Sequence, residues 1–346
     1  MATNVLNSLN AALHKMLSED PRVVVVGEDL LDPYGGAFKV TKGLSTQFPD
    51  RVLTTPLSEA GFTALAAGMA IRGLRPVVEI MFGDFLLLAA DQIINHIGKY
   101  RWMYNDKVRV PLVIRTPMGG RRGYGPTHSQ SLEKHFIGAP GWHVVAPSPF
   151  HDPGALLYRA VIEDDDPVLF IENKTMYARP VREAPSEGRL GDFHARTSSG
   201  RYPTVTLSFD SFSSADVTLV AYGGMAELAE AAAEQLLMRE EIFCEVVVPS
   251  SLSPIDLEPI LESLKRTGKL VVCEEGTQTA GWGAELIAAV SAQAFELLQA
   301  PPLRVAAKDL PIANTSTLET AILPQLEDID QAVLRACANS RRVTTR

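Results

Sequence analysis

The chain has 346 residues, of which 46% are hydrophobic and 21% are charged, and its formal net charge is −9. This length and composition are typical of a soluble globular protein with two domains of ordinary size. The acidic balance argues against a nucleic-acid partner, which would need a basic face.

Three widely spaced cysteines suggest a reducing compartment, with neither a disulfide framework nor a zinc site. Residues 1–17 lack a basic start followed by an apolar block, so we expect no signal peptide. The apolar run over residues 77–94 is interrupted by three acidic residues, so we expect no membrane partner and no membrane span. The sequence therefore favours a cytoplasmic protein.

Short β-branched runs alternate with helical patterns through the first half of the chain. Strands are predicted over residues 22–26, 51–54, 76–81, 110–115, 143–146 and 167–172. Helices are predicted over residues 4–17, 39–48, 86–99 and 153–161, and another begins at Glu59. This alternation predicts an α/β domain with a parallel sheet, in which ligands bind at the carboxyl ends of the strands.

The composition changes at residues 179–216, which are rich in Arg, Ser, Gly and Pro and show no strong period. We interpret this part as an interdomain connection. A second α/β domain follows, with strands predicted over 217–222, 244–249, 269–274 and 303–306. Its helices are predicted over 226–238, 257–267, 281–298 and from residue 329. The predicted division is therefore a domain over 1–185, a connecting segment over 186–215 and a domain over 216–346.

The stretch around Glu59 organises the first domain. Pro56 ends the preceding strand, Ser58 is a good helix N-cap, and an Ala-rich helix follows. A carboxylate in the first turn of a mostly apolar helix can simply complement the helix dipole. It is also a candidate for a functional acid, because perturbed carboxylates cluster at sites.

A long loop over residues 116–130, rich in Gly and Arg, carries His128. Loops of this length inside a compact domain are usually functional or mobile. A lone loop histidine is usually solvated and has no role, so His128 gains its interest only from the wider pattern described next.

The whole chain resembles the β subunit of the thiamine-diphosphate-dependent E1 component of 2-oxoacid dehydrogenase complexes. That family includes pyruvate, branched-chain 2-oxoacid and acetoin dehydrogenases. The matching segments are VVVGED at 24–29, YGGAFKV at 34–40, PLSE at 56–59, MFGDF at 81–85, DQIIN at 91–95, THSQ at 127–130, PVLFIEN at 167–173, LSPID at 252–256, EG at 275–276 and GWG at 281–283. They occur in order along nearly the whole chain, and residues 186–214 are the part without a match.

The resemblance implies a pyrimidine-binding, transketolase-like first domain and a C-terminal transketolase-like second domain. It implies decarboxylation of a 2-oxoacid with acyl transfer to a lipoyl group. Two alternatives stay open at this point. One is an acetoin- or transketolase-like carboligase or acyltransferase with another acceptor, and the other is a non-catalytic partner subunit.

In the family, a carboxyl group at the position that matches Glu59 forms a hydrogen bond with N1′ of the cofactor aminopyrimidine. This hydrogen bond helps a proton to leave thiazolium C2. That task needs a carboxyl group in an apolar pocket. Phe85 matches an aromatic residue that stacks on the pyrimidine, while Leu57 and Met81 match pocket walls that would help to bury Glu59. Without the resemblance, plain core packing would be the better explanation for Leu57, Met81 and Phe85.

Further positions follow from the same resemblance. His128 matches a histidine that faces the reacting carbon and assists acyl transfer, a role suited to imidazole near neutral pH. Glu28 and Asp91 match acidic positions near a channel between paired active sites.

A potassium ion is also implied, held mainly by main-chain carbonyls of residues in two parts of the first domain. Hard oxygen ligands suit such a cation. The acidic run at 164–166 would otherwise be interpreted as a solvated turn. The matching positions are Leu112, Val161, Ile162, Asp164 and Asp166.

The chain contains no Gly-Asp-Gly, the usual start of the motif that holds magnesium and the diphosphate of thiamine diphosphate. The sequence thus carries the pyrimidine half of a cofactor site without the phosphate half. The resemblance implies that an E1 α subunit supplies Mg²⁺ binding, in a heterotetramer of two α and two β chains. A lipoyl-bearing acyltransferase (E2) core is a further implied partner.

Overall fold

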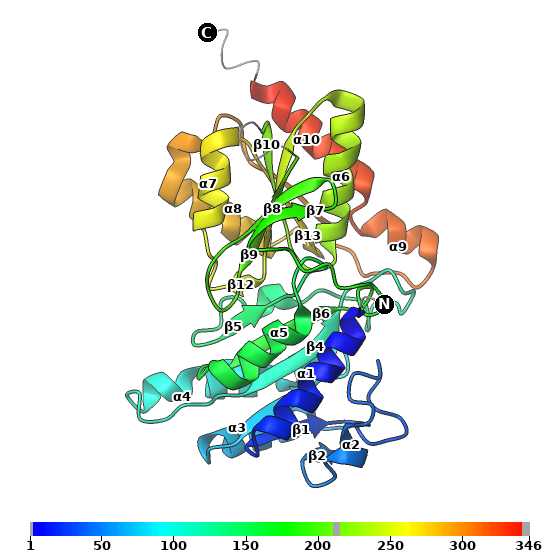
Figure 1. Cartoon of the computed structure of the whole chain (residues 1–346), viewed down its shortest axis with the longest axis vertical. Coiled ribbons are helices and arrows are strands. Elements are labelled where there is room, and N and C mark those ends of the chain that lie inside the picture. Colours follow the sequence, from blue (N-terminus) through cyan, green and yellow to red (C-terminus); the bar gives the residue numbers. More distant parts are fainter. Residues whose placement is uncertain (1–2, 210–214, 341–346) are drawn as a thin grey trace. The chain divides into compact units, whose positions relative to one another are not determined.

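The computed structural model describes residues 3–209 and 215–340 (Figure 1). The chain forms two compact units. The first takes in Met1–Gly119, His135–Pro147 and Asp152–Val181, and the second takes in Gly120–Lys134, Ser148–His151 and Arg182–Arg346. Residues 120–134 and 148–151, which we assigned to the first predicted domain, thus cluster with the second unit.

The six strands of the first unit form a parallel sheet in the order β5-β6-β4-β3-β1-β2, which confirms the predicted fold class. Every residue of β1, β3 and β4 is buried, as expected for central parallel strands covered on both faces. The strands are β1 (Val23–Gly27), β2 (Val52–Thr54), β3 (Arg75–Glu79), β4 (Val113–Met118), β5 (His143–Val145) and β6 (Val168–Asn173).

The helices of this unit match the sequence in part. Helices α1 (Val5–Glu19) and α5 (Pro153–Tyr158) pack side by side, joined by a 2.5 Å hydrogen bond from the Ser8 hydroxyl to Asp152. Helix α3 (Glu59–Ile71) begins at the predicted residue.

Two predicted helices are wrong in detail. The helix predicted over 39–48 shrinks to α2 (Leu44–Gln47), because Lys39 and Gly43 have left-handed backbone angles, φ 67° and 85°, that a right-handed helix cannot include.

The helix predicted over 86–99 is instead a 3₁₀ segment, η1 (Gly83–Ala89), a π segment, η2 (Gln92–Ile97), and α4 (Gly98–Met103). The Trp142 indole donates to the Ile93 carbonyl at 2.9 Å, and a side chain inserted in this way disturbs the regular helix ladder.

The second unit has a mixed sheet in the order β14-β13-β10-β11-β9-β8-β7. The four strands β10, β11, β13 and β14 are parallel, whereas β9, β8 and β7 join antiparallel. Their bounds are β7 (Glu187–Leu190), β8 (Phe193–Thr197), β9 (Thr204–Ser208), β10 (Val217–Ala221), β11 (Cys244–Pro249), β13 (Leu270–Thr277) and β14 (Leu303–Ala307). A short strand, β12 (Ser251–Ser253), was not predicted.

The prediction that residues 186–215 only connect the two domains is wrong for the described part of that segment. Strands β7 and β8 form a hairpin through Gly191 and Asp192, with Gly191 at φ 60°, and β9 pairs with β11. Edge strands such as β7 alternate between exposed and half-buried residues, so they lack the apolar run of a core strand. Residues 210–214 of the segment lie outside the described residues.

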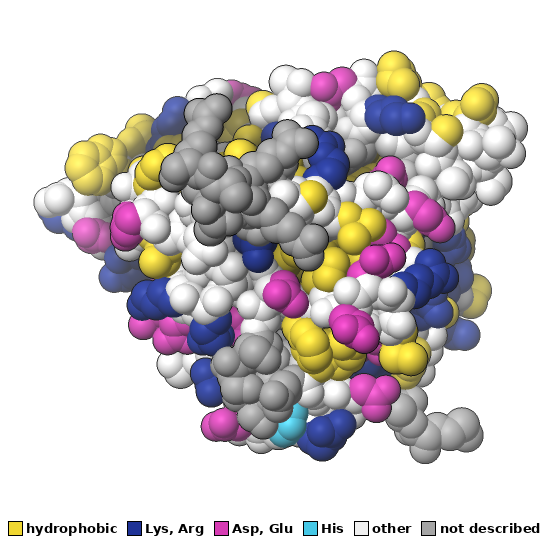
Figure 2. Space-filling view, turned by 90° about the horizontal axis from the view of Figure 1, so that it is seen from above, with side chains coloured by type: hydrophobic (Ala, Val, Ile, Leu, Met, Phe, Trp, Pro, Cys, Tyr) yellow, Lys and Arg dark blue, Asp and Glu magenta, His cyan; other side chains and the backbone are white. Residues whose placement is uncertain are grey.

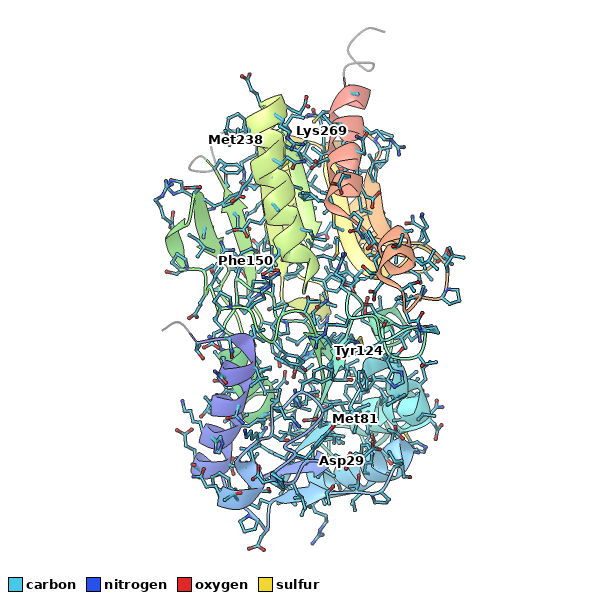
Figure 3. The ribbon with its side chains drawn as sticks, turned by 90° about the vertical axis from the view of Figure 1, so that its right-hand side faces the viewer. Asp29, Met81, Tyr124, Phe150, Met238 and Lys269 are labelled. Atoms are coloured by element: carbon cyan, nitrogen blue, oxygen red, sulfur yellow. The ribbon has the colours of Figure 1, made fainter. Side chains whose placement is uncertain are left out.

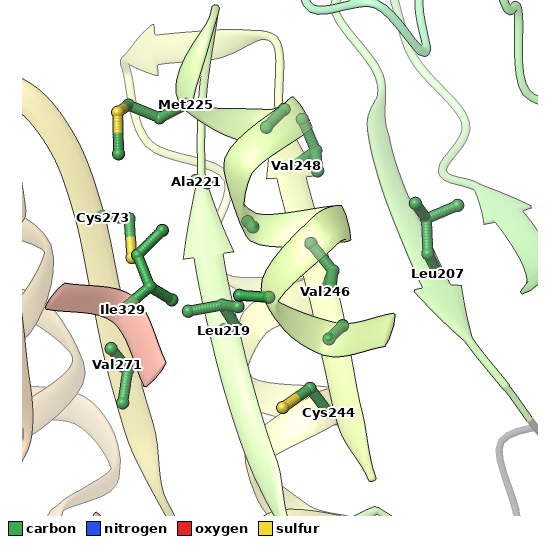
Figure 4. Close-up of a cluster of buried hydrophobic side chains, with 14 of the residues drawn as sticks. Leu207, Leu219, Ala221, Met225, Cys244, Val246, Val248, Val271, Cys273 and Ile329 are labelled. Carbon is green, nitrogen blue, oxygen red and sulfur yellow. The ribbon is translucent and has the colours of Figure 1, made fainter. Parts of the chain in front are cut away.

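Among the described residues, five α-helices complete the second unit. In Figure 1, α6 and α10 lie on one face of its sheet, and α7 and α8 lie on the other. The core between α6, α10 and the sheet includes Cys244, Cys273 and Ile329 (Figure 4), and the thiols of Cys244 and Cys273 are free. The helices are α6 (Met225–Glu240), α7 (Glu258–Thr267), α8 (Trp282–Ala294), α9 (Ser316–Ile322) and α10 (Leu326–Ser340).

Within residues 3–209 and 215–340, no helix is long and apolar enough to cross a membrane. On the face shown in Figure 2, Lys and Arg side chains alternate with Asp and Glu and with small apolar groups. This face offers no continuous basic surface of the kind that binds nucleic acid.

Gly27, the last residue of β1, lies where the backbones of the central strands β1 and β3 approach closely. A Cβ atom at Gly27 would lie 2.5 Å from the Glu79 carbonyl oxygen on β3, so Gly27→Ala must displace one backbone. We expect Gly27→Ala to lower the free energy of unfolding by about 1–3 kcal/mol, the usual cost of overpacking. Urea denaturation of the purified chain, followed by circular dichroism, measures this change.

Gly68→Ala is the matched control, because a Cβ at Gly68 in α3 meets no atom within 4 Å. It should stabilise the chain by about 0.5–1 kcal/mol through helix propensity. Equal stability of Gly27→Ala and the wild type would show that the strand spacing is looser than the structure indicates.

Candidate functional site

Glu59 is held at the first residue of α3, where it is only 8% exposed. Ser58 occupies the N-cap position as predicted, but its side chain makes no capping hydrogen bond. The partial positive charge of the helix N-terminus stabilises a carboxylate here. The helix therefore fixes the position of one buried acidic group at the edge where the parallel strands end.

Glu28 lies close to Glu59, immediately after β1, and is 6% exposed. Burial, followed by the negative charges of Glu59 and Asp29, raises the pKa of Glu28, although the Ser58 backbone amide donates a hydrogen bond to it. The Glu28 Oε1 atom has no hydrogen-bond partner among the described residues. Buried polar atoms without partners are rare in folded proteins, so this pair of carboxyl groups needs a donor from outside the chain.

Met81 and Phe85 follow β3, next to the end of β1, and both are half-buried. Phe85 packs edge-to-face against Phe82, with ring centroids 5.9 Å apart. Figure 3 shows Met81 and Asp29, which follow the paired strands β3 and β1. Leu57 is 83% exposed, so the expectation that it helps to bury Glu59 is wrong for this chain alone.

A buried ionic cluster ties together the strands that lead to these residues. Arg115 on β4 donates to Glu79 on β3 and, through Nε and Nη2, to both oxygens of Glu172 on β6 at 2.8 and 2.5 Å. The Tyr177 hydroxyl donates to Glu172 at 2.7 Å. A Cβ at Gly36 would lie 2.7 Å from Glu79 Oε1, so the loop that follows Glu28 needs glycine to pass the cluster.

Asp91 is exposed, and its contacts lie within its own helical segment. It accepts a 2.9 Å hydrogen bond from Asn95 and lies 3.3 Å from His96 Nε2. These contacts do not join Asp91 to the Glu28–Glu59 pair.

Two of the carbonyls expected to hold potassium already bind a guanidinium. Arg75 Nη1 donates to the Val161 and Asp164 carbonyls at 2.9 and 2.8 Å, and Nη2 pairs with Asp165 at 2.9 Å. A carbonyl oxygen can accept two hydrogen bonds or ligands, so a contact with Arg75 does not by itself rule out a cation at the same oxygen. Within the described ranges, no cluster of three or more His, Cys, Asp or Glu side chains could hold a metal ion, so a cation here would depend on main-chain oxygens.

The acidic run at 164–166 is more than a solvated turn. Asp164 is 1% exposed, accepts the Asp166 backbone amide at 3.2 Å and lies 2.8 Å from His143 Nδ1. Asp166 pairs with Arg101 at 2.5 Å. Leu112 directly precedes β4, and its carbonyl accepts a hydrogen bond from the Val168 amide. Val161 and Ile162 lie in the π segment η4 (Arg159–Glu163).

His128 belongs to the second unit, whereas Glu28, Leu57, Glu59, Met81 and Phe85 belong to the first. Its ring Nδ1 lies 2.9 Å from the Thr127 hydroxyl, and its amide donates to the Gly125 carbonyl at 3.3 Å. The neighbouring Ser129 hydroxyl is fully buried and has no partner among the residues that the structure describes.

The sequence reasoning missed three residues that these segments depend on. Arg75 is the first residue of the buried strand β3, where an arginine suggests a buried partner. Glu133 and Tyr222, joined by a hydrogen bond described below, are both buried and lie 89 positions apart in the sequence. Only the tertiary fold brings them together.

Comparison with known proteins agrees with this architecture. Residues 2–180 match the family "Transketolase, pyrimidine binding domain", and residues 212–329 match "Transketolase, C-terminal domain". The chain is 39% identical to pyruvate dehydrogenase E1 component subunit beta-1, mitochondrial, of Arabidopsis thaliana, over 97% of this chain and 90% of that protein. It is 37% identical to pyruvate dehydrogenase E1 component subunit beta of Rickettsia bellii, over 97% and 99%.

A solved structure shares the fold. A split-gene transketolase, described as an inactive tetramer of beta chains, superposes with a TM-score of 0.73 at 24% identity, covering 99% of this chain and 100% of that one. The match of both domains and of nearly the full length of the relatives leads to one conclusion. The chain belongs to the family of pyruvate dehydrogenase E1 β subunits, within the transketolase-like proteins.

Proposed function

We propose that this chain is the β subunit of a thiamine-diphosphate-dependent 2-oxoacid dehydrogenase E1 component, which decarboxylates a 2-oxoacid and transfers the acyl group to a lipoyl group. The observation that carries the proposal is the buried Glu28–Glu59 pair with its unpartnered Oε1 atom. An aminopyrimidine ring offers both hydrogen-bond donors and acceptors, and it therefore fits two adjacent carboxyl groups. The names of the relatives make pyruvate the first substrate to test.

Each residue has a definite task in this proposal. Glu59, fixed by α3, holds a proton in a hydrogen bond with N1′ of the pyrimidine, and Glu28 binds the same side of the ring. Phe85 and Met81 line the ring faces, and exposed Leu57 becomes covered once the cofactor or the partner chain is present. When bound, thiamine diphosphate supplies the nucleophilic carbon that attacks the 2-oxoacid and accepts the electron pair released on decarboxylation.

His128 is the proposed acid–base residue for acyl transfer. An imidazole can donate or accept a proton near neutral pH, as the transfer to a lipoyl sulfur requires. Its half-buried position leaves the ring partly accessible to a substrate.

An E1 α subunit completes the site in this proposal. The sequence has no Gly-Asp-Gly, so the groups that bind Mg²⁺ and the diphosphate come from that partner. We propose a heterotetramer of two α and two β chains, located in the cytoplasm, that delivers acyl groups to a lipoyl-bearing E2 core. Apolar side chains left exposed on the first unit, such as Leu57, Leu65 and Leu88, support an assembly with a partner.

We also propose a potassium ion at the main-chain carbonyls of Leu112, Val161, Ile162, Asp164 and Asp166. The convergence of the Val161 and Asp164 carbonyls on one side chain, Arg75, shows that main-chain oxygens gather here and supports the proposal. The Arg75 charge opposes a second cation, but Asp165 pairs with that guanidinium and reduces the repulsion.

Glu59→Gln tests the proposed function. The variant keeps the side-chain shape but cannot hold the proton, so exchange of the cofactor C2 proton in the assembled α–β enzyme should slow by about 10²–10⁴-fold. NMR of quenched samples measures the exchange, and size-exclusion chromatography checks the assembly. Glu262→Gln, on the exposed face of α7, is the matched control. Wild-type exchange in Glu59→Gln would remove Glu59 from the chemistry.

Glu28→Gln should stabilise the chain in a pH-dependent manner. The folded state raises the pKa of Glu28, so it binds more protons than the unfolded state and loses stability as the pH rises above the unfolded value. The variant should therefore unfold at a higher temperature than wild type near about pH 8, with the difference shrinking toward about pH 5. A difference that does not change with pH would contradict the raised pKa of Glu28.

Salt exchange tests the potassium proposal. Potassium chloride should raise the melting temperature of the chain above its value in tetramethylammonium chloride at equal ionic strength, because only the folded chain presents the carbonyl ring. Identical melting temperatures in both salts would mean that the Arg75 guanidinium alone satisfies these carbonyls.

A further inference from the structure

The segment that carries His128, residues 120–134, is fastened to the second unit at both ends. At its start, the Gly120 amide donates to Glu275 at 2.6 Å, and the amides of Arg121 and Gly123 donate to Glu319 at 2.7 and 3.3 Å. Glu275 and Glu319 are 6% and 5% exposed. The sequence predicted a mobile glycine-rich loop here, whereas the structure shows its backbone amides bound to buried carboxylates.

At the other end of the segment, Glu133 is 1% exposed and accepts a hydrogen bond from the Tyr222 hydroxyl at 2.5 Å. Tyr222 packs edge-to-face on the fully buried Trp282, with ring centroids 5.0 Å apart. The next residue, Lys134, donates to the Thr277 hydroxyl and the Thr279 carbonyl at 2.5 and 2.8 Å. The attachment point is therefore part of the rigid core of the unit.

The charges around Glu133 are unbalanced. Glu274 and Glu275 on β13 both face it. Glu274 pairs with Arg304 on β14, and Glu275 lies 3.7 Å from Arg121. Among the described residues, Glu133 has a neutral phenol as its partner and no paired cation. A leucine would fill such a buried place at a lower desolvation cost, so a carboxyl group there indicates a task beyond packing.

We propose that Glu133 is a positioning residue for His128: hydrogen-bonded to Tyr222 in the core, it fixes the C-terminal end of the segment on which His128 sits, five residues away. The inference rests on the proposed function of His128. It adds that the second unit, through Glu133, sets where the imidazole is presented.

Protonation of Glu133 controls this attachment. Burial, with the added repulsion from Glu274 and Glu275, raises the pKa of Glu133 to about 7, although the Tyr222 hydrogen bond opposes the rise. A released, solvated Glu133 would titrate near its ordinary value. The attached state binds more protons, so it loses stability as the pH rises from that ordinary value through the raised one.

Hydrogen–deuterium exchange of the assembled α–β enzyme tests the attachment without relying on activity. After correction for intrinsic rates, protection of residues 120–134 in the wild type should fall by about tenfold between about pH 5.5 and about pH 8. Glu133→Gln, permanently neutral, should keep its protection at both pH values. Tyr222→Phe and Glu133→Ala should lower it at both, and exposed Glu262→Gln should behave as wild type.

Kinetics then test the link to His128. Glu133→Ala should lower kcat for acyl transfer by about tenfold or more with little change in KM, and Glu133→Gln should restore it. In a His128→Ala background, Glu133→Ala should cost nothing further, because the two residues act as one unit. An equal loss in both backgrounds, or unchanged protection in Glu133→Ala and Tyr222→Phe, would overturn the inference. Failure of the proposed function itself would appear separately, as wild-type C2 exchange in Glu59→Gln.

Discussion

The candidate site depends on one buried arginine. Arg115 is 1% exposed and lies between Glu79 and Glu172, so it links three neighbouring strands of the first unit near their carboxyl ends. Removing one member of such a group leaves an uncompensated buried charge, which typically costs about 3–5 kcal/mol. The cluster is therefore weak evidence of stability but strong evidence of a fixed geometry. Loops that leave this edge of the sheet, including the one with Met81, start from positions that are held by charge as well as by strand pairing.

The first unit has a fully packed core, but its candidate site has a buried polar atom without a partner among the described residues and an exposed apolar side chain. Its central strands are fully buried, yet Glu28 keeps an unpartnered oxygen and Leu57 is almost fully exposed. A folded chain normally satisfies its buried polar groups, so the Glu28 oxygen fits the proposal that a cofactor binds here, and the exposed Leu57 fits the proposal that another subunit covers this surface. The proposed division of labour, in which this chain binds the pyrimidine and a partner binds the phosphates, accounts for both of them and for the missing Gly-Asp-Gly.

The second unit contributes more than a passive C-terminal domain. At one end of the His128 segment, backbone amides donate hydrogen bonds to the buried carboxylates of Glu275 and Glu319. At the other end, the Tyr222 hydroxyl donates a hydrogen bond to Glu133 of the segment. Glycines give that segment little apolar area to bury, so hydrogen bonds to Glu275, Glu319 and Tyr222 take over the work that side-chain packing does elsewhere. In our proposal, the order of the segment is coupled to the protonation of Glu133, whose raised pKa lies close to neutral pH.

Sequence periodicity by itself determined the alternating strands and helices, the parallel first sheet and the start of α3 at Glu59, because these features follow from local apolar patterns and capping residues. The ordered motifs also identified the family. Strand β7 escaped prediction because it is an edge strand without a core period. Strands β8 and β9 lie inside the sheet and were missed because they pair antiparallel within a segment rich in Gly, Ser, Pro and Arg. The helix over 86–99 was altered by an indole that comes from Trp142 in a distant segment. Only the tertiary structure decided which polar groups meet. These are Glu28 with Glu59, Arg75 with the Val161 and Asp164 carbonyls, and Glu133 with Tyr222. Such pairs join residues far apart in the chain, and no local pattern records a contact that exists only after folding.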